Sequence, residues 1–264
     1  MSAMSAYEIF NPDGAPALLL LCDHASNAVP DAINGGDLGL PPEDMARHIA
    51  YDVGARGVTL ALARLMDAPA VLSTFSRLVI DPNRGEDDPT LVMQLYDGSV
   101  IPANRHAGHQ EVEARLDAWH RPYHRAIRAQ IIAAQARLGG AAQARLGADV
   151  SGPALLSIHS YTPQLRGRPP RPWHAGVLWD RDPRLAVPLI ELLRAEPDLV
   201  VGDNEPYEGH LAGDTMWEHG TLPGLPHALL EIRNDLIETE AQQIAWAERL
   251  LPIVRAAMAR IPAA

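Results

Sequence analysis

The sequence predicts an α/β fold in one domain, with a mostly parallel sheet that carries helices on both faces. Uninterrupted apolar runs, such as residues 17–22 and 153–159, are typical of strands buried on both faces. These runs alternate with longer segments that have the apolar period of amphipathic helices. No linker divides the 264 residues. We therefore expect a single domain over residues 1–264, of which residues 1–16 form a loose lead-in.

The N-terminal half supplies the first strands and helices. After the strand at 17–22, Pro41 and Pro42 precede two acidic residues and mark the start of a helix. This helix, or a pair broken near Gly54, runs to about Met66. A second strand is expected at 68–74 and a third short one within 76–84. A helical region follows over about 104–138, kinked or split at Pro122 because proline lacks the N–H of a helix interior.

The C-terminal half repeats the alternation. The heptapeptide AAQARLG occurs at 133–139 and again at 141–147, which we interpret as the lengthening of an exposed connection. Segment 203–224 is rich in glycine, polar and aromatic residues, a composition suited to a loop that contacts substrate. We expect strands at 153–159, 174–180, 199–202 and 226–235, a proline-rich loop at 166–173, and helices at 183–195 and 238–260.

Composition and charge exclude several classes of protein. A formal charge of −11 and a pI of about 5.4 argue against a nucleic-acid-binding surface. No apolar segment approaches the roughly 20 residues that span a membrane. Cys22 is the single cysteine, so an internal disulfide and a multi-cysteine metal cluster are excluded. No basic segment precedes the first apolar run, as a signal peptide would require. We expect a cytoplasmic protein without nucleic-acid or membrane partners.

Three buried runs lead to ionisable residues. Asp23 and His24 follow the first strand, His159 ends a second, and Glu231 with Arg233 lies late in the last. In open α/β sheets such groups converge at the carboxyl edge. Two imidazoles and a carboxylate suit Zn²⁺, and a further glutamate could take a proton from water. Alternatively, the histidines are separate hydrogen-bonded residues, since no HExxH or CxxC motif is present.

Two arginines form a candidate anion site in the stretch SRLVIDPNR. Arg77 and Arg84 flank Asp81 and Asn83, and a guanidinium binds a carboxylate through two hydrogen bonds. Asp81 could orient one guanidinium and leave the other for substrate. The alternative is a structural ion pair between Arg77 and Asp81 across a turn. The chain has no lysine, so a substrate carboxylate must be held by arginine, histidine or backbone amides.

Further residues have two interpretations each. Arg233 shares a strand face with Glu231, so it could bind a substrate carboxylate or the developing oxyanion, or simply pair with that glutamate. His120 and His124 lie one helical turn apart and could bind one metal ion. Because Pro122 lies between them, we favour structural roles for both. A serine hydrolase is disfavoured, since no Gly-x-Ser-x-Gly motif is present.

Five stretches carry a resemblance to a known family. CDHASNAVP, SRLVIDPNR, WHRPYH, SIHSYTP and LLEIRND, in this order, resemble the N-formylglutamate amidohydrolase (deformylase) family over about residues 17–250. The resemblance implies a fold similar to zinc carboxypeptidases and metal-dependent hydrolysis of an amide on an acidic amino acid. It implies His24 and His159 as metal ligands, Glu231 as general base or acid, and His219 as a substrate contact.

One departure from that pattern leaves the third metal ligand open. Sites of the zinc carboxypeptidase type usually place a glutamate a few residues after the first histidine, whereas Asn27 stands there in this chain. An amide is a poorer ligand for zinc than a carboxylate. The third ligand is therefore Asp23, Asp52 beside His48, or no protein residue. We expect Zn²⁺ or another divalent metal.

The leading hypothesis is a metal-dependent amidohydrolase that removes a small acyl group, such as formyl, from an N-acylated acidic amino acid. One alternative keeps the machinery but hydrolyses another amide, for example in a peptidoglycan fragment or another acyl amino acid. The other is a metal-free relative that binds an acidic ligand without turnover. We expect a small acidic acyl amino acid as the partner, and a monomer or small homo-oligomer.

Overall fold

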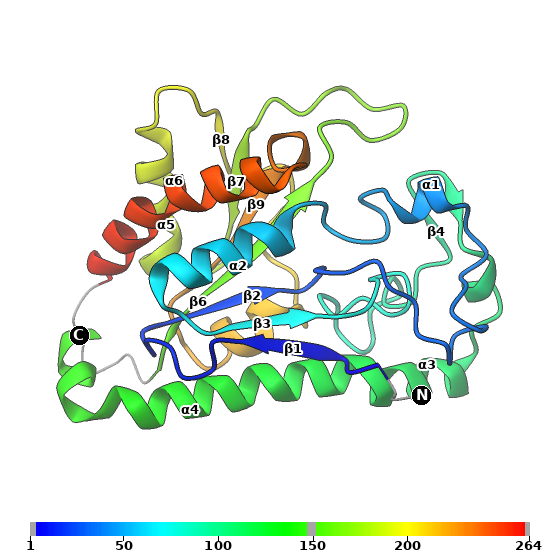
Figure 1. Cartoon of the computed structure of the whole chain (residues 1–264), viewed down its shortest axis with the longest axis horizontal. Helices are drawn as coiled ribbons and strands as arrows, with labels where there is room; N and C mark the ends of the chain where they lie inside the picture. Colours follow the sequence, from blue (N-terminus) through cyan, green and yellow to red (C-terminus); the bar gives the residue numbers. More distant parts are fainter. Residues whose placement is uncertain (1–3, 147–151, 262–264) are drawn as a thin grey trace.

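The computed structural model describes residues 4–146 and 152–261, which are organised around one seven-stranded sheet (Figure 1). The strand order is β1-β3-β2-β6-β9-β7-β8. The strands of this sheet are β1 (Tyr7–Phe10), β2 (Leu18–Cys22), β3 (Ala70–Ser73), β6 (Ala154–Tyr161), β7 (Ala175–Leu178), β8 (Val201–Asp203) and β9 (His227–Arg233). The α-helices are α1 (Pro42–Met45), α2 (Ala55–Met66), α3 (His109–Arg115), α4 (Arg121–Leu146), α5 (Pro183–Arg194) and α6 (Glu240–Ala259).

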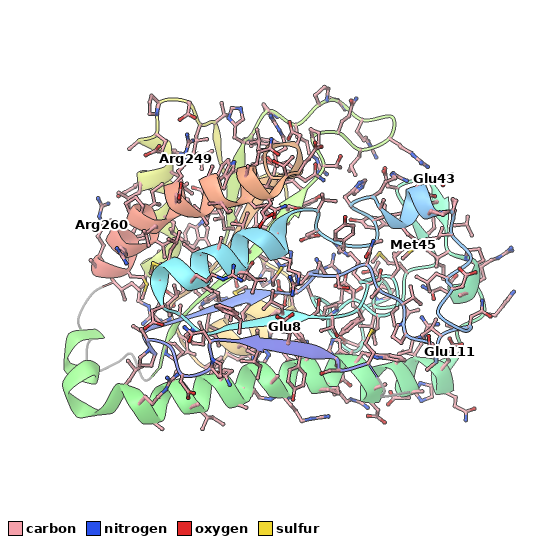
Figure 2. The ribbon with its side chains drawn as sticks, in the orientation of Figure 1. Glu8, Glu43, Met45, Glu111, Arg249 and Arg260 are labelled. Atoms are coloured by element: carbon pink, nitrogen blue, oxygen red, sulfur yellow. The ribbon has the colours of Figure 1, made fainter. Side chains whose placement is uncertain are left out.

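The sheet is mixed and mostly parallel, which confirms the predicted fold class. Strands β3, β2, β6 and β9 run parallel to one another in the centre. At one edge β1, the strand that carries Glu8 (Figure 2), pairs antiparallel with β3. At the other, β7 pairs antiparallel with β9 and parallel with β8. The carboxyl ends of β2, β6 and β9 therefore lie side by side.

Both faces of the sheet are covered, which explains the uninterrupted apolar runs. In β2, Leu18 and Leu20 belong to the apolar cluster that includes residues of α2, α5 and α6, whereas Leu19 and Leu21 belong to the cluster that includes residues of α4. Figure 1 shows α2, α5 and α6 on one side of the sheet and α4 running along the other. None of the helices in the described residues is long and apolar enough to cross a membrane.

The predicted strand within residues 76–84 is wrong. This segment forms turns, and Leu78, Val79 and Ile80 are buried in a second apolar cluster beside the sheet. A strand and a buried turn can share one short apolar run, so the sequence pattern does not separate them. An unpredicted two-stranded hairpin follows, formed by β4 (Leu95–Tyr96) and β5 (Ser99–Val100).

Two further expectations are corrected. Residues 1–16 contain strand β1, so they are not merely a loose lead-in. The duplicated AAQARLG segments continue helix α4 up to Leu146 rather than forming a connection, and residue 147 lies outside the described residues. A π-helical turn at Leu116–His120 joins α3 directly to α4, and the helix continues through Pro122, which has no N–H to donate and lies just after this turn. Helices α1 and α2 are separate, with Gly54 between them, as one of our two alternatives expected.

Three short turns complete the chain. Two are 3₁₀ turns, at Pro102–Asn104 and Asn234–Leu236, and the third is a π-helical turn at Trp217–Thr221. The π-helical turn belongs to segment 203–224, which connects β8 to β9. This segment and the turn at 76–84 both reach the end of β2, because Thr215 donates to Asp23 and Asp81 contacts His24.

Candidate metal centre

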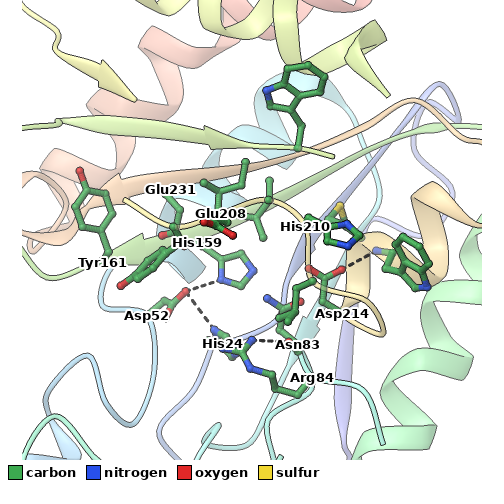
Figure 3. A pocket seen from close by; sticks show the side chains of 18 of the residues that line it. His24, Asp52, Asn83, Arg84, His159, Tyr161, Glu208, His210, Asp214 and Glu231 are labelled. Carbon is green, nitrogen blue, oxygen red and sulfur yellow. Dashed lines mark hydrogen bonds and ion pairs between the residues drawn. The ribbon is translucent and has the colours of Figure 1, made fainter. Parts of the chain in front are cut away.

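The carboxyl ends of β2 and β6 bring two histidines together. His24 follows β2, and His159 lies in β6, the parallel neighbour of β2. Their rings meet edge to face with centroids 4.9 Å apart, and both side chains are buried. The convergence expected from the two strand ends is therefore present in the structure (Figure 3).

Asp52 lies between the two rings. Its Oδ2 is 3.4 Å from Nδ1 of His24 and 2.8 Å from Nδ1 of His159. The backbone holds it there, because the N–H of Asp52 donates to the carbonyl oxygen of His24. Gly54 makes the following turn with a φ of +82°, and a Cβ at Gly54 would lie 2.1 Å from the carbonyl oxygen of Ile237.

Each imidazole also has a carboxylate behind it. Nε2 of His24 lies 2.7 Å from Asp81 Oδ1, and Nε2 of His159 lies 2.7 Å from Asp23 Oδ2. Ionised carboxylates only accept, so each Nε2 carries the hydrogen. This arrangement is the one that fixes metal-binding histidines in other proteins, because it leaves the other ring nitrogen free as a ligand.

The centre therefore needs a cation between its acceptors. Burial opposes the charge of His159, but its bonds to Asp23 and Asp52 raise its pKa well above the usual range. Contacts with His159 and His24 outweigh burial at Asp23 and Asp52, so the pKa values of these two acids lie below their usual range. Burial is likewise outweighed at Asp81, where Arg77 and then His24 hold the pKa well below its usual range. In the metal-free protein a proton on His159 supplies this positive charge. A bound metal ion would supply it instead. One ligand atom each from His24, Asp52 and His159 lies within 4.8 Å of the others.

Of the possible third ligands, the geometry supports Asp52. Asp23 lies behind His159 rather than between the two Nδ1 atoms. His48 lines the same cavity but is not part of the group of close ligand atoms, and burial lowers its pKa to about 4. Asn27 is exposed and donates to a backbone carbonyl away from the centre.

Glu231 faces the same cavity from β9, where it pairs in register with His159 of β6. It is buried, and burial raises its pKa to about 7. Among the described residues its Oε2 has no hydrogen-bond partner. The alternative of an ion pair with Arg233 is not formed, because the Nε of Arg233 donates to Asp235. Glu231 is therefore an unpaired carboxyl group poised between its two protonation states at neutral pH.

The two arginines of SRLVIDPNR have different surroundings. Arg77 donates to Asp81 at 2.7 and 3.1 Å and lies 3.6 Å from Asp52, so it forms the structural ion pair of our alternative interpretation. Arg84 donates to the Asn83 carbonyl and to a threonine, and within the described residues no carboxylate pairs with it. Arg77, Asn83 and Arg84 all line the cavity. Arg84 is therefore the better placed of the two to bind an anion.

A cavity of about 320 Å³ opens in front of the centre (Figure 3). The segment 203–224, which we predicted to contact substrate, lines this cavity. Asp214 in this segment is buried, and burial raises its pKa to about 7. The wall also has apolar side chains, namely Leu178 of β7, Leu229 of β9 and Met216, which directly precedes the π-helical turn.

Two candidate substrate contacts lie away from this cavity. His219 is not among the lining residues, and its Nε2 lies 2.8 Å from Nδ1 of His124. Arg233 is not among them either and is held by Asp235 and the carbonyl of Trp173. A substrate role for either residue remains a prediction.

Sequence reasoning did not identify the full surroundings of Asp23. Tyr123, Ser157 and Thr215 each donate a hydroxyl hydrogen bond to its carboxylate, at 2.7–2.9 Å. These donors come from α4, β6 and segment 203–224, so no spacing in the sequence connects them. The position of Asp23 at a strand end was the one available signal.

Comparison with known proteins gives a consistent result. The sequence model of the N-formylglutamate amidohydrolase family matches residues 16–238. The crystal structure of gene product Atu2144 from Agrobacterium tumefaciens is 31% identical with a TM-score of 0.86, and the match covers 98% of this chain and 96% of that one. An N-formylglutamate amidohydrolase from Ralstonia eutropha JMP134 is 20% identical with a TM-score of 0.66, and the match covers 97% and 98% of the two chains. Among proteins with curated descriptions, none matches significantly.

Proposed function

The chain belongs to the N-formylglutamate amidohydrolase family, and we propose that it hydrolyses N-formyl-L-glutamate to formate and glutamate in a metal-dependent reaction. One observation carries the proposal. Two imidazole Nδ1 atoms and a buried carboxylate converge at the sheet edge, and a second carboxylate holds each imidazole from behind. Two histidines and one carboxylate are the protein ligands of many zinc hydrolases.

His24, Asp52 and His159 would hold the metal ion, which when bound supplies Lewis-acid activation of the amide carbonyl and of water. The residues fit such an ion because a carboxylate accepts the hydrogen of each Nε2 and both Nδ1 atoms face Asp52, so an ion could replace the proton between His159 and Asp52. Asp52 brings the negative charge that a divalent cation needs. The N–H of Ser160 donates to Asp52 Oδ2 at 3.2 Å and helps to orient this carboxylate.

Glu231 would move the proton. It would take a proton from the attacking water as the water oxygen adds to the formyl carbon. It would then deliver that proton to the amide nitrogen as the C–N bond breaks, so the free amine leaves with formic acid, which ionises to formate. A pKa of about 7 lets one carboxyl group act as base and then as acid near neutral pH. The unpartnered Oε2 in the cavity supports this role.

Arg84 would bind a substrate carboxylate, because it lines the cavity and no carboxylate of the described residues neutralises it. Asn83 lies beside it, and its Oδ1 accepts from the N–H of Thr215, which ties it to the facing segment. Arg77 keeps its position between Asp81 and Asp52 and would act by holding those carboxylates rather than by binding substrate.

A second candidate function keeps the same chemistry but acts on another amide. The apolar wall of Leu178, Met216 and Leu229 favours it, since formyl and a glutamate side chain leave little apolar surface to cover. The substrate would then be an N-acyl amino acid with a larger apolar part, or a peptidoglycan fragment.

Formate release tests the proposal. Purified protein should contain a divalent metal and release formate from N-formyl-L-glutamate, and a chelator should abolish the release. N-formyl-L-glutamine is a matched substrate that keeps the shape and lacks the side-chain charge, and we expect a higher KM for it. Turnover only of larger acyl amino acids or peptides would favour the second candidate. Absence of metal together with absence of turnover across this panel would contradict both.

A further inference from the structure

A second group of buried imidazoles lies apart from the candidate metal centre. His120 ends the π-helical turn Leu116–His120, His124 lies in the first turn of α4, and His219 lies in the π-helical turn Trp217–Thr221. Each is at most 3% exposed, and none of the three lines the main cavity. The ring centroids of His120 and His124 are 4.4 Å apart, and those of His124 and His219 are 5.1 Å apart. Three neutral imidazoles buried together need polar partners.

Backbone carbonyls fix the tautomers of two of these rings. Nε2 of His124 lies 2.9 Å from the carbonyl oxygen of Pro82, and Nε2 of His120 lies 2.9 Å from that of Arg84. A carbonyl oxygen only accepts, so each Nε2 donates its hydrogen and each Nδ1 is a bare lone pair. Metal-binding histidines are held in the same way, by a carbonyl or carboxylate on the far nitrogen. Nδ1 of His120 is buried and has no partner among the described residues.

Nδ1 of His124 faces two further atoms that could bind a metal ion. Nε2 of His219 lies 2.8 Å from it and Oε2 of Glu218 lies 3.9 Å from it. One ligand atom each from His124, Glu218 and His219 lies within 4.8 Å of the others. Burial lowers the pKa of His219 to about 4 and that of His124 well below its usual range.

We propose that His124 Nδ1, His219 Nε2 and Glu218 form a second site for a divalent transition-metal ion of the zinc class. Two neutral imidazoles and one carboxylate are ligands that Zn²⁺ prefers. In the free protein His219 donates its Nε2 hydrogen to His124. On metal binding, the hydrogen of His219 moves from Nε2 to Nδ1, which is the other neutral tautomer. Nδ1 of His124 and Nε2 of His219 can then both bind the ion, and the charge of neither ring changes. Glu218 turns from Arg128, 3.4 Å away, to the ion.

The position of the site gives it a structural role. It joins helix α4 to the π-helical turn through His124 and His219. Through the Pro82 carbonyl it also holds the turn that carries Asn83 and Arg84. The π-helical turn and the turn that carries Asn83 and Arg84 both line the cavity, so a bound ion would hold its wall in place without entering it. The inference does not depend on the reaction proposed above.

Zinc content measured at a fixed, chelator-buffered free zinc concentration tests this site. We expect the wild-type protein to hold about one ion more than either His219→Gln or Glu218→Gln, since each variant removes one of three ligands. Glu218 is partly exposed, so Glu218→Gln gives a folded variant even if His219→Gln does not fold. His106→Gln, at an exposed histidine, is the matched control and should keep the wild-type content. Thermal unfolding in the same zinc buffers should show that zinc stabilises wild type more than Glu218→Gln.

A difference of one ion supports the second site, whatever the first site holds. Equal zinc content in wild type, Glu218→Gln and folded His219→Gln would overturn it, and so would an equal loss in His106→Gln. In those cases His124 and His219 form an ordinary hydrogen-bonded pair.

Discussion

Asp23 and His159 are 136 residues apart in the chain, yet Oδ2 of Asp23 lies 2.7 Å from Nε2 of His159. This bond crosses from the end of β2 to its parallel neighbour β6. Asp81 makes the equivalent bond to His24 from the turn at 76–84. Each of the two histidines therefore contacts its own aspartate through Nε2 and the shared Asp52 through Nδ1. The orientation of both imidazoles thus depends on Asp23 and Asp81, to which we assign no contact with substrate.

We predict that Asp23→Asn weakens metal binding by about 10–100-fold, the usual effect of losing a carboxylate behind a histidine ligand. The amide keeps the volume of the side chain but no longer fixes the hydrogen on Nε2 of His159. Chelator competition measures the change in affinity. Ser157→Ala removes one donor to the same carboxylate and leaves the charge, so it should have a smaller effect. Wild-type affinity in Asp23→Asn would contradict the orienting role.

Glu231→Gln should lower kcat by about 10² or more, the scale of general acid–base catalysis. Glutamine keeps the shape of the side chain and cannot take up a proton. Metal content, KM and the thermal midpoint should stay close to wild type, because Oε2 of Glu231 has no partner to lose. Retention of more than about a tenth of the wild-type kcat would remove Glu231 from proton transfer. A parallel loss of stability would instead assign it a structural role.

Arg84→Ala should raise KM for N-formyl-L-glutamate much more than it lowers kcat, because the carboxylate contact is the same in the ground state and the transition state. Steady-state kinetics measure both parameters. Arg105→Ala, at an exposed arginine of the same charge, is the control and should leave KM unchanged. An unchanged KM in Arg84→Ala would return this arginine to a structural role.

Asp214→Asn should change how stability depends on pH. Burial raises the pKa of Asp214 from 3.8 to about 7 in the folded protein. The unfolded chain loses this proton at lower pH than the folded one, so the contribution of Asp214 to stability falls as pH rises from about 4 to 7. Between pH 5 and 8 the variant should gain on the order of 2 kcal/mol relative to wild type. Denaturant unfolding at both pH values measures the gain, and an equal difference at the two would contradict the shifted pKa.

Three residues of the site could be predicted from the sequence because each lies at or near the end of a single buried apolar segment. His24, His159 and Glu231 stand at or near the ends of apolar segments, and parallel strands bring such ends to one edge. The strand pairing confirms this, with Leu21 opposite Ser157 and His159 opposite Glu231. The fold class followed from the same runs.

The remaining parts depend on contacts that leave no pattern in the sequence. Asp52 reaches the centre because its backbone N–H binds the carbonyl of His24, 28 residues away, so Asp52 could only be one of several candidate ligands. The residues around Ile80 have the apolar character of a strand but pack in a second cluster of turns. That turn is what brings Asp81 to His24, so the wrong strand assignment also concealed this contact.

Anomalous diffraction at the zinc absorption edge, from crystals of zinc-loaded protein, tests the central claim most directly. The account predicts a peak about 2.0–2.2 Å from Nδ1 of His24, Nδ1 of His159 and a carboxylate oxygen of Asp52, the usual zinc-ligand distances. Zinc-loaded crystals without a peak among these three atoms would contradict it.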